Sequence, residues 1–134
     1  MRRRPLPSRF FDRSTTVVAR ALLGQELAVR TGRGERVVRI VETEAYVATD
    51  PASHAFRGRT TRNDSMFGPP GTLYVFRIHQ VVCANITTRP GEAVLLRAGE
   101  PLQKSLPNTS GPGRLCRALG ITLRDDGSNV RTGR

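Results

Sequence analysis

Two glutamates stand two positions apart, Glu42 and Glu44, at the end of an apolar run that is typical of a β-strand. Side chains two positions apart on a strand point to the same face of a sheet. The two carboxylates should therefore lie together, and one of them could act as a general base that takes a proton from a reacting group. The alternative is that both form ordinary surface ion pairs with nearby arginines.

Few other side chains could do chemistry. His54 lies in a polar segment, where a lone histidine can be structural or catalytic. The two histidines and two cysteines lack the spacing of a zinc site, and there is no phosphate-binding or dinucleotide-binding glycine motif, so we expect no metal and no cofactor. A Schiff-base mechanism needs an amine, and the choices are Lys104, in a predicted loop, and the N-terminus. Chemistry by an activated water molecule fits this sequence better.

Aromatic residues fall in or beside the polar, arginine-rich segment 50–70 and the strand predicted after it. They are Tyr46, Phe56, Phe67, Tyr74 and Phe76. Aromatic rings interleaved with arginines suit a site that stacks an unpaired nucleic-acid base. The alternative is ordinary core packing, which we favour for Phe67 and Tyr74.

These side chains need a framework of helices and strands to position them. The pattern predicts a helix over 12–23, capped by Asp12 or Ser14 and stopped by Gly24. A second helix, 114–119, is opened by Gly111-Pro112-Gly113. Strands are predicted at 26–30, 36–43, 71–78, 81–86 and 92–97, with a hairpin loop between the first two.

The remaining segments should be irregular. Residues 50–70 and 102–110 are predicted loops, and so long a loop as the first is usually functional or disordered. Residues 1–9 and 124–134 are expected to be flexible. Since strands dominate over two helices, the predicted fold class is α+β, a single compact domain over 1–134 with a curved, mainly antiparallel β core and flanking short helices.

The net charge of the chain indicates which class of partner to expect. The 134 residues contain 22 Lys and Arg against 11 Asp and Glu, which gives a formal net charge of +11. A small domain this basic is expected to bind a polyanion, first of all nucleic acid, although a bias toward arginine with a solvated surface would give the same excess. No signal peptide and no membrane span are evident, so we expect a soluble, cytoplasmic protein.

The segment with the two glutamates reads Arg39-Ile40-Val41-Glu42-Thr43-Glu44-Ala45-Tyr46. Further motifs follow in order: Asp50-Pro51-Ala52-Ser53-His54, Thr61-Arg62-Asn63, Met66-Phe67, Pro70-Gly71-Thr72-Leu73-Tyr74-Val75, Cys83-Ala84-Asn85, Val94-Leu95-Leu96-Arg97-Ala98, Glu100-Pro101 and Gly111-Pro112-Gly113-Arg114-Leu115-Cys116. Together they cover about 22–121 and resemble the alkyladenine (3-methyladenine) DNA glycosylase family. The resemblance implies a monofunctional DNA repair enzyme, one domain, that flips alkylated or deaminated purines from duplex DNA and releases them by hydrolysis.

The resemblance also implies roles for particular residues. Glu44 matches the general base that activates the attacking water, and Arg97 matches the arginine that helps to hold this water. The residues that match the stacking positions around the flipped base are Tyr46, His54 and Phe76, the last of which is usually Tyr in the family. Asn85 matches the asparagine at the pocket wall that clashes with the amino group of normal guanine.

Contacts with the DNA are implied as well. Family members insert an aromatic wedge into the gap left by the flipped base, and His79 is the best match here, with Ile78 or Gln80 as alternatives because the hairpin is one residue shorter. The arginines placed to hold phosphates are Arg57, Arg59, Arg62 and Arg114. The expected partner is double-stranded DNA containing damaged purines, bound by a monomer that is not attached to a membrane. A bacterial type of protein, associated with the nucleoid, is expected.

Two alternatives remain open. Segment 102–110 is compressed relative to the family, and relatives continue with further strands after the Gly-Pro-Gly helix, so we expect this chain to be shortened at the C-terminus. It could then be a catalytically impaired relative that only binds DNA. An RNA-binding, ribosome-associated protein is suggested by charge alone. The presence together of Glu44, His54 and Arg97 favours an enzyme, because a pure binder would not need them.

Overall fold

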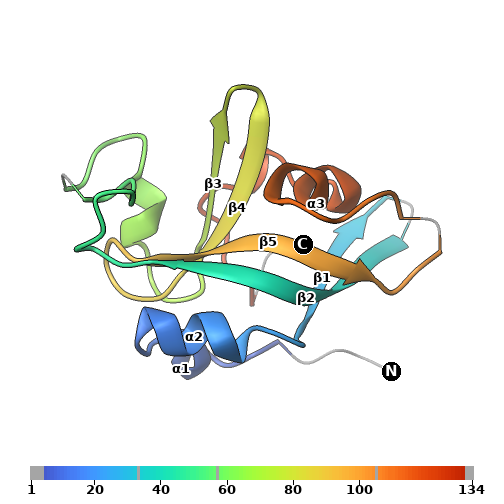
Figure 1. The fold of residues 1–134 in the computed structure, drawn as a ribbon, viewed down its shortest axis with the longest axis horizontal. Helices are drawn as coiled ribbons and strands as arrows, with labels where there is room; N and C mark the ends of the chain where they lie inside the picture. Colours follow the sequence, from blue (N-terminus) through green and yellow to red (C-terminus); the bar gives the residue numbers. More distant parts are fainter. Residues whose placement is uncertain (1–4, 33, 57, 105, 132–134) are drawn as a thin grey trace.

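The computed structural model describes residues 5–32, 34–56, 58–104 and 106–131. Within these residues, five antiparallel strands form one curved sheet in the order β1-β2-β5-β4-β3 (Figure 1). The strands are β1 (Glu26–Thr31), β2 (Gly34–Tyr46), β3 (Leu73–Ile78), β4 (Val81–Thr87) and β5 (Ala93–Pro101). The α-helices are α1 (Ser8–Phe11), α2 (Thr15–Ala21) and α3 (Pro112–Leu119), with short 3-10 helices η1 (Asp64–Phe67) and η2 (Leu123–Asp125). The predicted fold class, α+β with a mainly antiparallel sheet, is confirmed.

Helices cover the sheet on two sides. In Figure 1, α1 and α2 lie below the long strands β2 and β5, and α3 lies above them beside β4. The main core joins these layers, and among its fully buried side chains are Val18 of α2, Val38 of β2, Leu96 of β5 and Leu115 of α3. Each such side chain contributes roughly 1.5–3 kcal/mol to folding through removal of apolar surface from water. No helix among the described residues is both long and apolar enough to cross a membrane.

The hairpin of β3 and β4 stands out from the sheet (Figure 1). β4 pairs with β5 only over Asn85, Ile86 and Thr87, so the outer half of the hairpin has no neighbour strand in the sheet. Ile78 pairs with Val81, which leaves a two-residue turn at the tip. Both turn residues have positive φ, the pattern of the type I′ turn that matches the twist of paired strands. The hairpin therefore presents its turn as a protruding point.

The first helical region contains two short helices. The sequence predicts one helix over 12–23; α2 lies within that range with Ser14 at its N-cap, and α1 is a separate short helix before it. Phe11 is 2% exposed in the core, and the buried hydroxyl of Thr15 contacts Thr88 at 2.7 Å and donates to Glu92 at 2.6 Å. Because the chain changes direction between α1 and α2, the side chains of Phe11 and Thr15 are both buried.

The two longest strands, β2 and β5, run beyond their predicted ends. β2 runs on to Tyr46 and β5 to Pro101, three or four residues beyond the ends expected from the alternation of apolar residues. The β2–β5 ladder continues on both sides of an irregularity, with Tyr46 opposite Ala93 and Val38 opposite Pro101. Backbone pairing thus extends the strands beyond the residues whose side-chain pattern marks them as strand.

The end of the described chain lies against the start of β3. We expected residues 124–134 to be flexible; Leu123–Asp125 form η2, and residues 127–130 pair with residues 71–73. Leu73 N–H donates to Ser128 O at 2.6 Å, Gly127 N–H to Leu73 O at 2.8 Å, and Val130 N–H to Gly71 O at 2.9 Å. These bonds satisfy backbone groups of Gly71 and Leu73, where the outer edge of β3 begins.

Candidate active site

A row of side chains crosses four strands at the centre of the site. Glu44 on β2 lies opposite Leu95 on β5, Leu95 opposite Asn85 on β4, and Asn85 opposite Tyr74 on β3. Residues opposite one another across a sheet point to the same face. The sheet thus aligns a carboxylate, an amide and a phenol that lie far apart in the sequence.

Arg97 connects the two glutamates. Its Nε donates to Glu42 Oε1 at 3.0 Å, and its Nη1 donates to Glu44 Oε1 at 3.0 Å. The two carboxylates therefore share a face, as their spacing predicts. The hydroxyl of Tyr46 also donates to Glu44 Oε1, at 3.1 Å. Among the described residues, no hydrogen bond is found to Glu44 Oε2, so this oxygen is available to a water molecule or a substrate.

The cluster is close to solvent. The side chains of Glu42, Glu44 and Arg97 are 60%, 46% and 39% exposed. The hydrogen bond to Glu42 is the main cause that raises the pKa of Arg97, so the guanidinium stays charged. Burial, and then the hydrogen bond to Glu44, raises the pKa of Tyr46, so its phenol keeps the proton that it donates.

A cavity of about 270 Å³ opens beside this cluster. It is lined by Tyr46, Ala52, His54, Met66, Tyr74, Phe76, Ile78, Asn85 and Leu95. The structure thus brings together the four residues expected at a base pocket. The volume is near the lower end of small-molecule sites, about 300–1,000 Å³, and the lining is mostly aromatic and apolar with a few polar groups, as is typical of them.

His54 forms part of an aromatic wall. Its ring centre lies 4.3 Å from that of Phe76, and its Nδ1 is 2.9 Å from the hydroxyl of Tyr74. Burial, together with the charge of Arg62, lowers the pKa of His54, so the imidazole is neutral at pH 7. Burial raises the pKa of Tyr74 to about 12. The wall therefore carries no charge of its own, which suits stacking against the aromatic ring of a base.

Tyr74 has two roles that the sequence analysis did not combine. We favoured a core position for it, and it is 3% exposed within a small cluster with Ala55, Met66 and Ala93. It also lines the cavity and contacts His54. Its position two residues before Phe76 on the same strand was the signal that could have placed it in the pocket.

Asn63 organises the loop that carries His54, and sequence reasoning missed this function. Its buried amide donates to His54 O at 2.9 Å and to Gly58 O at 3.0 Å, and accepts from Thr60 N–H at 2.6 Å. Asparagine commonly satisfies backbone groups in loops, which was the available signal. Within the described residues of segment 50–70, these hydrogen bonds hold the loop, which also contains η1.

Asn85 lines the cavity from β4. It is 4% exposed, and its Nδ2 donates to Tyr74 O at 3.2 Å. A buried amide held by the backbone of the neighbouring strand has little freedom to move, because a lost hydrogen bond in this position costs about 1–3 kcal/mol. Asn85 therefore gives the pocket a polar wall of fixed position.

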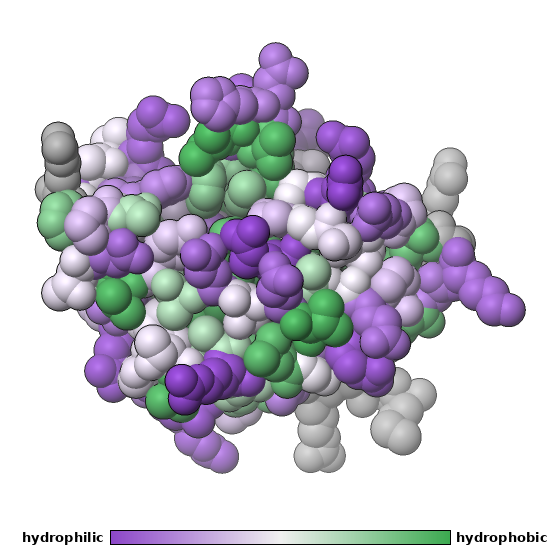
Figure 2. Space-filling model, in the orientation of Figure 1, coloured by the Kyte–Doolittle hydropathy of each residue, from purple (hydrophilic) through white to green (hydrophobic). Residues whose placement is uncertain are grey.

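The hairpin tip carries the candidate wedge residues. His79 has φ of 50° and Gln80 has φ of 67°, and both are exposed. Just below them, Ile78 and Val81 are each 43% exposed. Figure 2 shows hydrophobic side chains gathered under the hydrophilic tip of the hairpin. The hairpin turn thus combines two polar residues at its tip with two exposed apolar residues beside them. This combination is suited to contact with stacked bases.

Of the four arginines expected at phosphates, three lie in described residues and Arg57 lies outside them. Arg59 Nε pairs with Asp64 Oδ1 at 2.5 Å, and its guanidinium lies 5.5 Å from the ring centre of Phe67. Arg62 lines a second cavity that shares His54 and Phe76 with the first. Arg114 is exposed in the first turn of α3.

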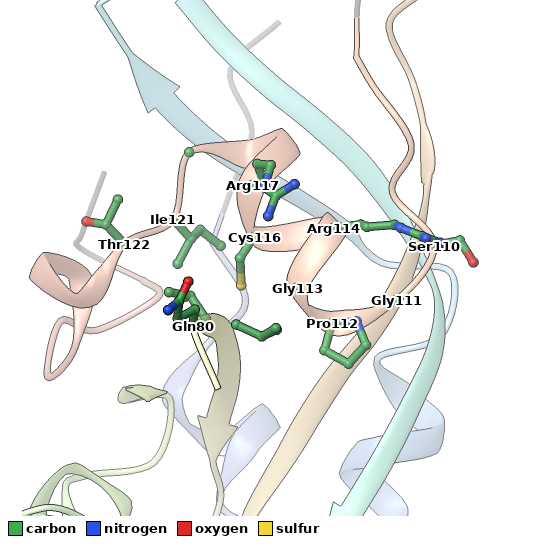
Figure 3. Close-up of a pocket in the computed structure, with 13 residues that line it drawn as sticks. Gln80, Ser110, Gly111, Pro112, Gly113, Arg114, Cys116, Arg117, Ile121 and Thr122 are labelled. Carbon is green, nitrogen blue, oxygen red and sulfur yellow. The ribbon is translucent and has the colours of Figure 1, made fainter. Parts of the chain in front are cut away.

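Arg114 also borders a separate cavity of about 590 Å³ between α3 and the hairpin. Figure 3 shows α3 on one side of it and Gln80 on the other. A Cβ at Gly113 would collide with the side chain of Val81, so glycine allows this close approach. None of the residues expected around a flipped base lines this cavity. Among the described residues, no three His, Cys, Asp or Glu side chains gather as metal ligands.

Comparison with known proteins agrees with this geometry. The model of a family described as methylpurine-DNA glycosylase matches residues 9–134. Curated relatives with the name "Putative 3-methyladenine DNA glycosylase" include proteins from Agrobacterium fabrum, 48% identical over 92% of this chain and 68% of its own length, and Anaeromyxobacter dehalogenans, 50% identical over 90% and 61%. A third, from Methanoculleus marisnigri, is 44% identical over 96% and 74%.

A curved antiparallel sheet thus carries a carboxylate beside an aromatic cavity, in a domain with a net charge of +11. The chain belongs to the methylpurine-DNA glycosylase family, a family of DNA repair proteins. It spans about two thirds of the length of the relatives that it matches.

Proposed function

We propose that the chain is a DNA glycosylase that flips alkylated or deaminated purines out of duplex DNA and hydrolyses the N-glycosidic bond. The observation that carries the proposal is the position of Glu44. One of its carboxylate oxygens is held by Arg97 and Tyr46, the other has no partner among the described residues, and Tyr46 lines the adjoining cavity. This is the arrangement that a general base for water requires.

The flipped purine would stack among Tyr46, His54 and Phe76, because every base offers an aromatic face to such rings. Asn85 would exclude normal guanine, whose exocyclic amino group would meet the amide held against the backbone of Tyr74. Phe76 can stack on the purine but has no hydroxyl to form a hydrogen bond with it. The polar atoms of the purine must therefore be recognised by the other residues of the pocket. Flipping costs a few kcal/mol and less for damaged pairs, which adds to selectivity.

In the reaction, the bond between the sugar C1′ and the purine nitrogen breaks, and its electron pair leaves with the purine. The sugar develops the positive charge of an oxocarbenium ion, which the carboxylate of Glu44 stabilises. The water oxygen forms a bond to C1′ as its proton passes to Glu44 Oε2. Arg97 fixes the carboxylate through Oε1 and helps to hold the water. No lysine is required, and the enzyme would be a monofunctional hydrolase without a metal or cofactor.

The partner in this proposal is double-stranded DNA containing damaged purines, bound by a monomer in the cytoplasm in association with the nucleoid. The test is release of the base from labelled duplexes that contain 3-methyladenine, hypoxanthine or only normal bases. We expect release from at least one damaged duplex and none from the undamaged one. Tight binding to damaged duplex without any release would instead identify a DNA-binding relative that does not cut.

The hairpin tip should act as the wedge, through His79. His79→Gly removes the side chain while glycine adopts the positive φ of this position without strain. Excision from duplex is expected to fall roughly tenfold or more, since an inserted side chain offsets part of the few kcal/mol that unstacking costs. Excision from single strands should change little, and the ratio of the two rates measures the effect. Gln80→Gly is the matched control, and a larger duplex-specific loss there would assign the wedge to Gln80.

A further inference from the structure

Glu42 is part of the cluster but has no role in the proposed reaction. Its carboxylate accepts from Arg97 Nε, while Nη1 of the same guanidinium donates to Glu44. An arginine can instead contact both oxygens of one carboxylate through two parallel bonds, which is a common and strong arrangement. Here the guanidinium is divided between two carboxylates and gives Glu44 a single bond.

The backbone is irregular where these side chains meet. In the β2–β5 ladder, Ile40 lies opposite Gly99, Glu42 opposite Ala98 and Thr43 opposite Leu96. Val41 on β2 and Arg97 on β5 are therefore each left without an opposite residue. Bulges of this kind redirect side chains and are frequent beside active sites. This pair of bulges brings Arg97 within reach of Glu42 and Glu44 together.

Stability does not account for this arrangement. The three side chains are between 39% and 60% exposed, and exposed ion pairs contribute at most about 1 kcal/mol. A second exposed pair on the same two strands, Arg39 with Glu100 at 3.9 Å, has no bond to a third charged group in the described residues. It provides an internal comparison for an ion pair without a catalytic neighbour.

We propose that Glu42 is a positioning residue: it holds the Nε side of Arg97, prevents this arginine from binding both oxygens of Glu44, and so keeps Glu44 Oε2 free to accept the proton of water. The proposal rests on the proposed function, because it assigns Glu44 as the base. Glu42 itself does not contact the substrate. Its side chain acts as a hydrogen-bond acceptor, and an amide oxygen can take its place.

The first test is structural and independent of activity. In a crystal structure of Glu42→Ala, the Arg97 guanidinium should turn and contact both oxygens of Glu44. In Glu42→Gln, the amide oxygen should still accept from Arg97 Nε, and the single bond to Glu44 should persist. An Arg97 that keeps its orientation and its single contact with Glu44 in Glu42→Ala would overturn the proposal, whether or not the protein excises bases.

The second test uses single-turnover excision with enzyme in excess over a damaged duplex. Glu42→Ala should slow excision about tenfold, a part of the 10²–10⁴-fold that a general base provides, while the Kd for the duplex stays unchanged. Glu42→Gln should recover most of the rate. In an Arg97→Lys background, Glu42→Ala should have an additional effect of less than about twofold, because residues that act through one another are not additive.

Glu100→Ala is the control for loss of an exposed glutamate on the same strands, and it should leave rate and melting temperature unchanged. A loss of rate in Glu42→Ala that persists in the Arg97→Lys background would contradict positioning through Arg97. Failure of the proposed function is distinguishable, because the unmodified protein would then excise no base while the crystallographic comparison still decides the orientation of Arg97.

Discussion

Glu44→Gln should lower the rate of damaged-base release by at least about 10²-fold, the lower end of the range typical of general base catalysis. The amide preserves the shape of the side chain and can still accept from Arg97 and Tyr46, so the local geometry should persist. It cannot take a proton from water or stabilise a positive sugar through a full negative charge. The measurement is single-turnover release from a duplex that contains one damaged purine.

Binding provides the control for this variant. The duplex Kd of Glu44→Gln should stay near that of the unmodified protein, and its melting temperature should also be retained because the side chain is 46% exposed. Glu42→Gln is the chemically matched comparison two residues away and should retain most of the rate. A folded Glu44→Gln protein with near-normal turnover would rule out the mechanism.

The period of a strand explains why part of the site could be predicted. Side chains two positions apart must share a face, so Glu42 and Glu44 could be placed together from the sequence. The helix α3 was also predictable, since Pro112 near its start and Gly120 just past its end are local signals. These features depend only on residues that are close in the chain.

The parts of the site and of the fold that the sequence did not predict depend on contacts between segments that are distant in the chain. The row from Glu44 to Tyr74 is set by the register of four strands, which no short pattern determines. The link between Arg97 and both glutamates needs two bulges, and bulges leave no clear mark in composition. The edge contacts of residues 127–130 were missed for the same reason, because their polar sequence resembles a loop until β3 supplies backbone partners.

Binding to duplex DNA should weaken steeply as salt rises. Each phosphate neutralised contributes about 0.9 log units of affinity per log unit of salt, so four arginine contacts would give a slope near −3.6 and a loss of roughly 10²-fold between 50 and 200 mM salt. The motive is the net charge of +11 together with the expected contacts of Arg57, Arg59, Arg62 and Arg114. Titrations at several salt concentrations measure the slope, and a flat dependence would exclude an electrostatic interface.

Replacement of individual arginines should reduce the magnitude of this slope by different amounts. Arg114→Gln should reduce its magnitude by about one, because Arg114 is exposed in the first turn of α3 and no ion pair to it is found among the described residues. Arg59→Gln should reduce it less, since Arg59 already pairs with Asp64 at 2.5 Å and part of its charge is offset before DNA binds. Arg20→Gln, on α2 and outside the expected interface, is the control and should leave the slope unchanged. Equal reductions for all three variants would mean that salt dependence reflects net charge alone, and that no particular arginine contacts a phosphate.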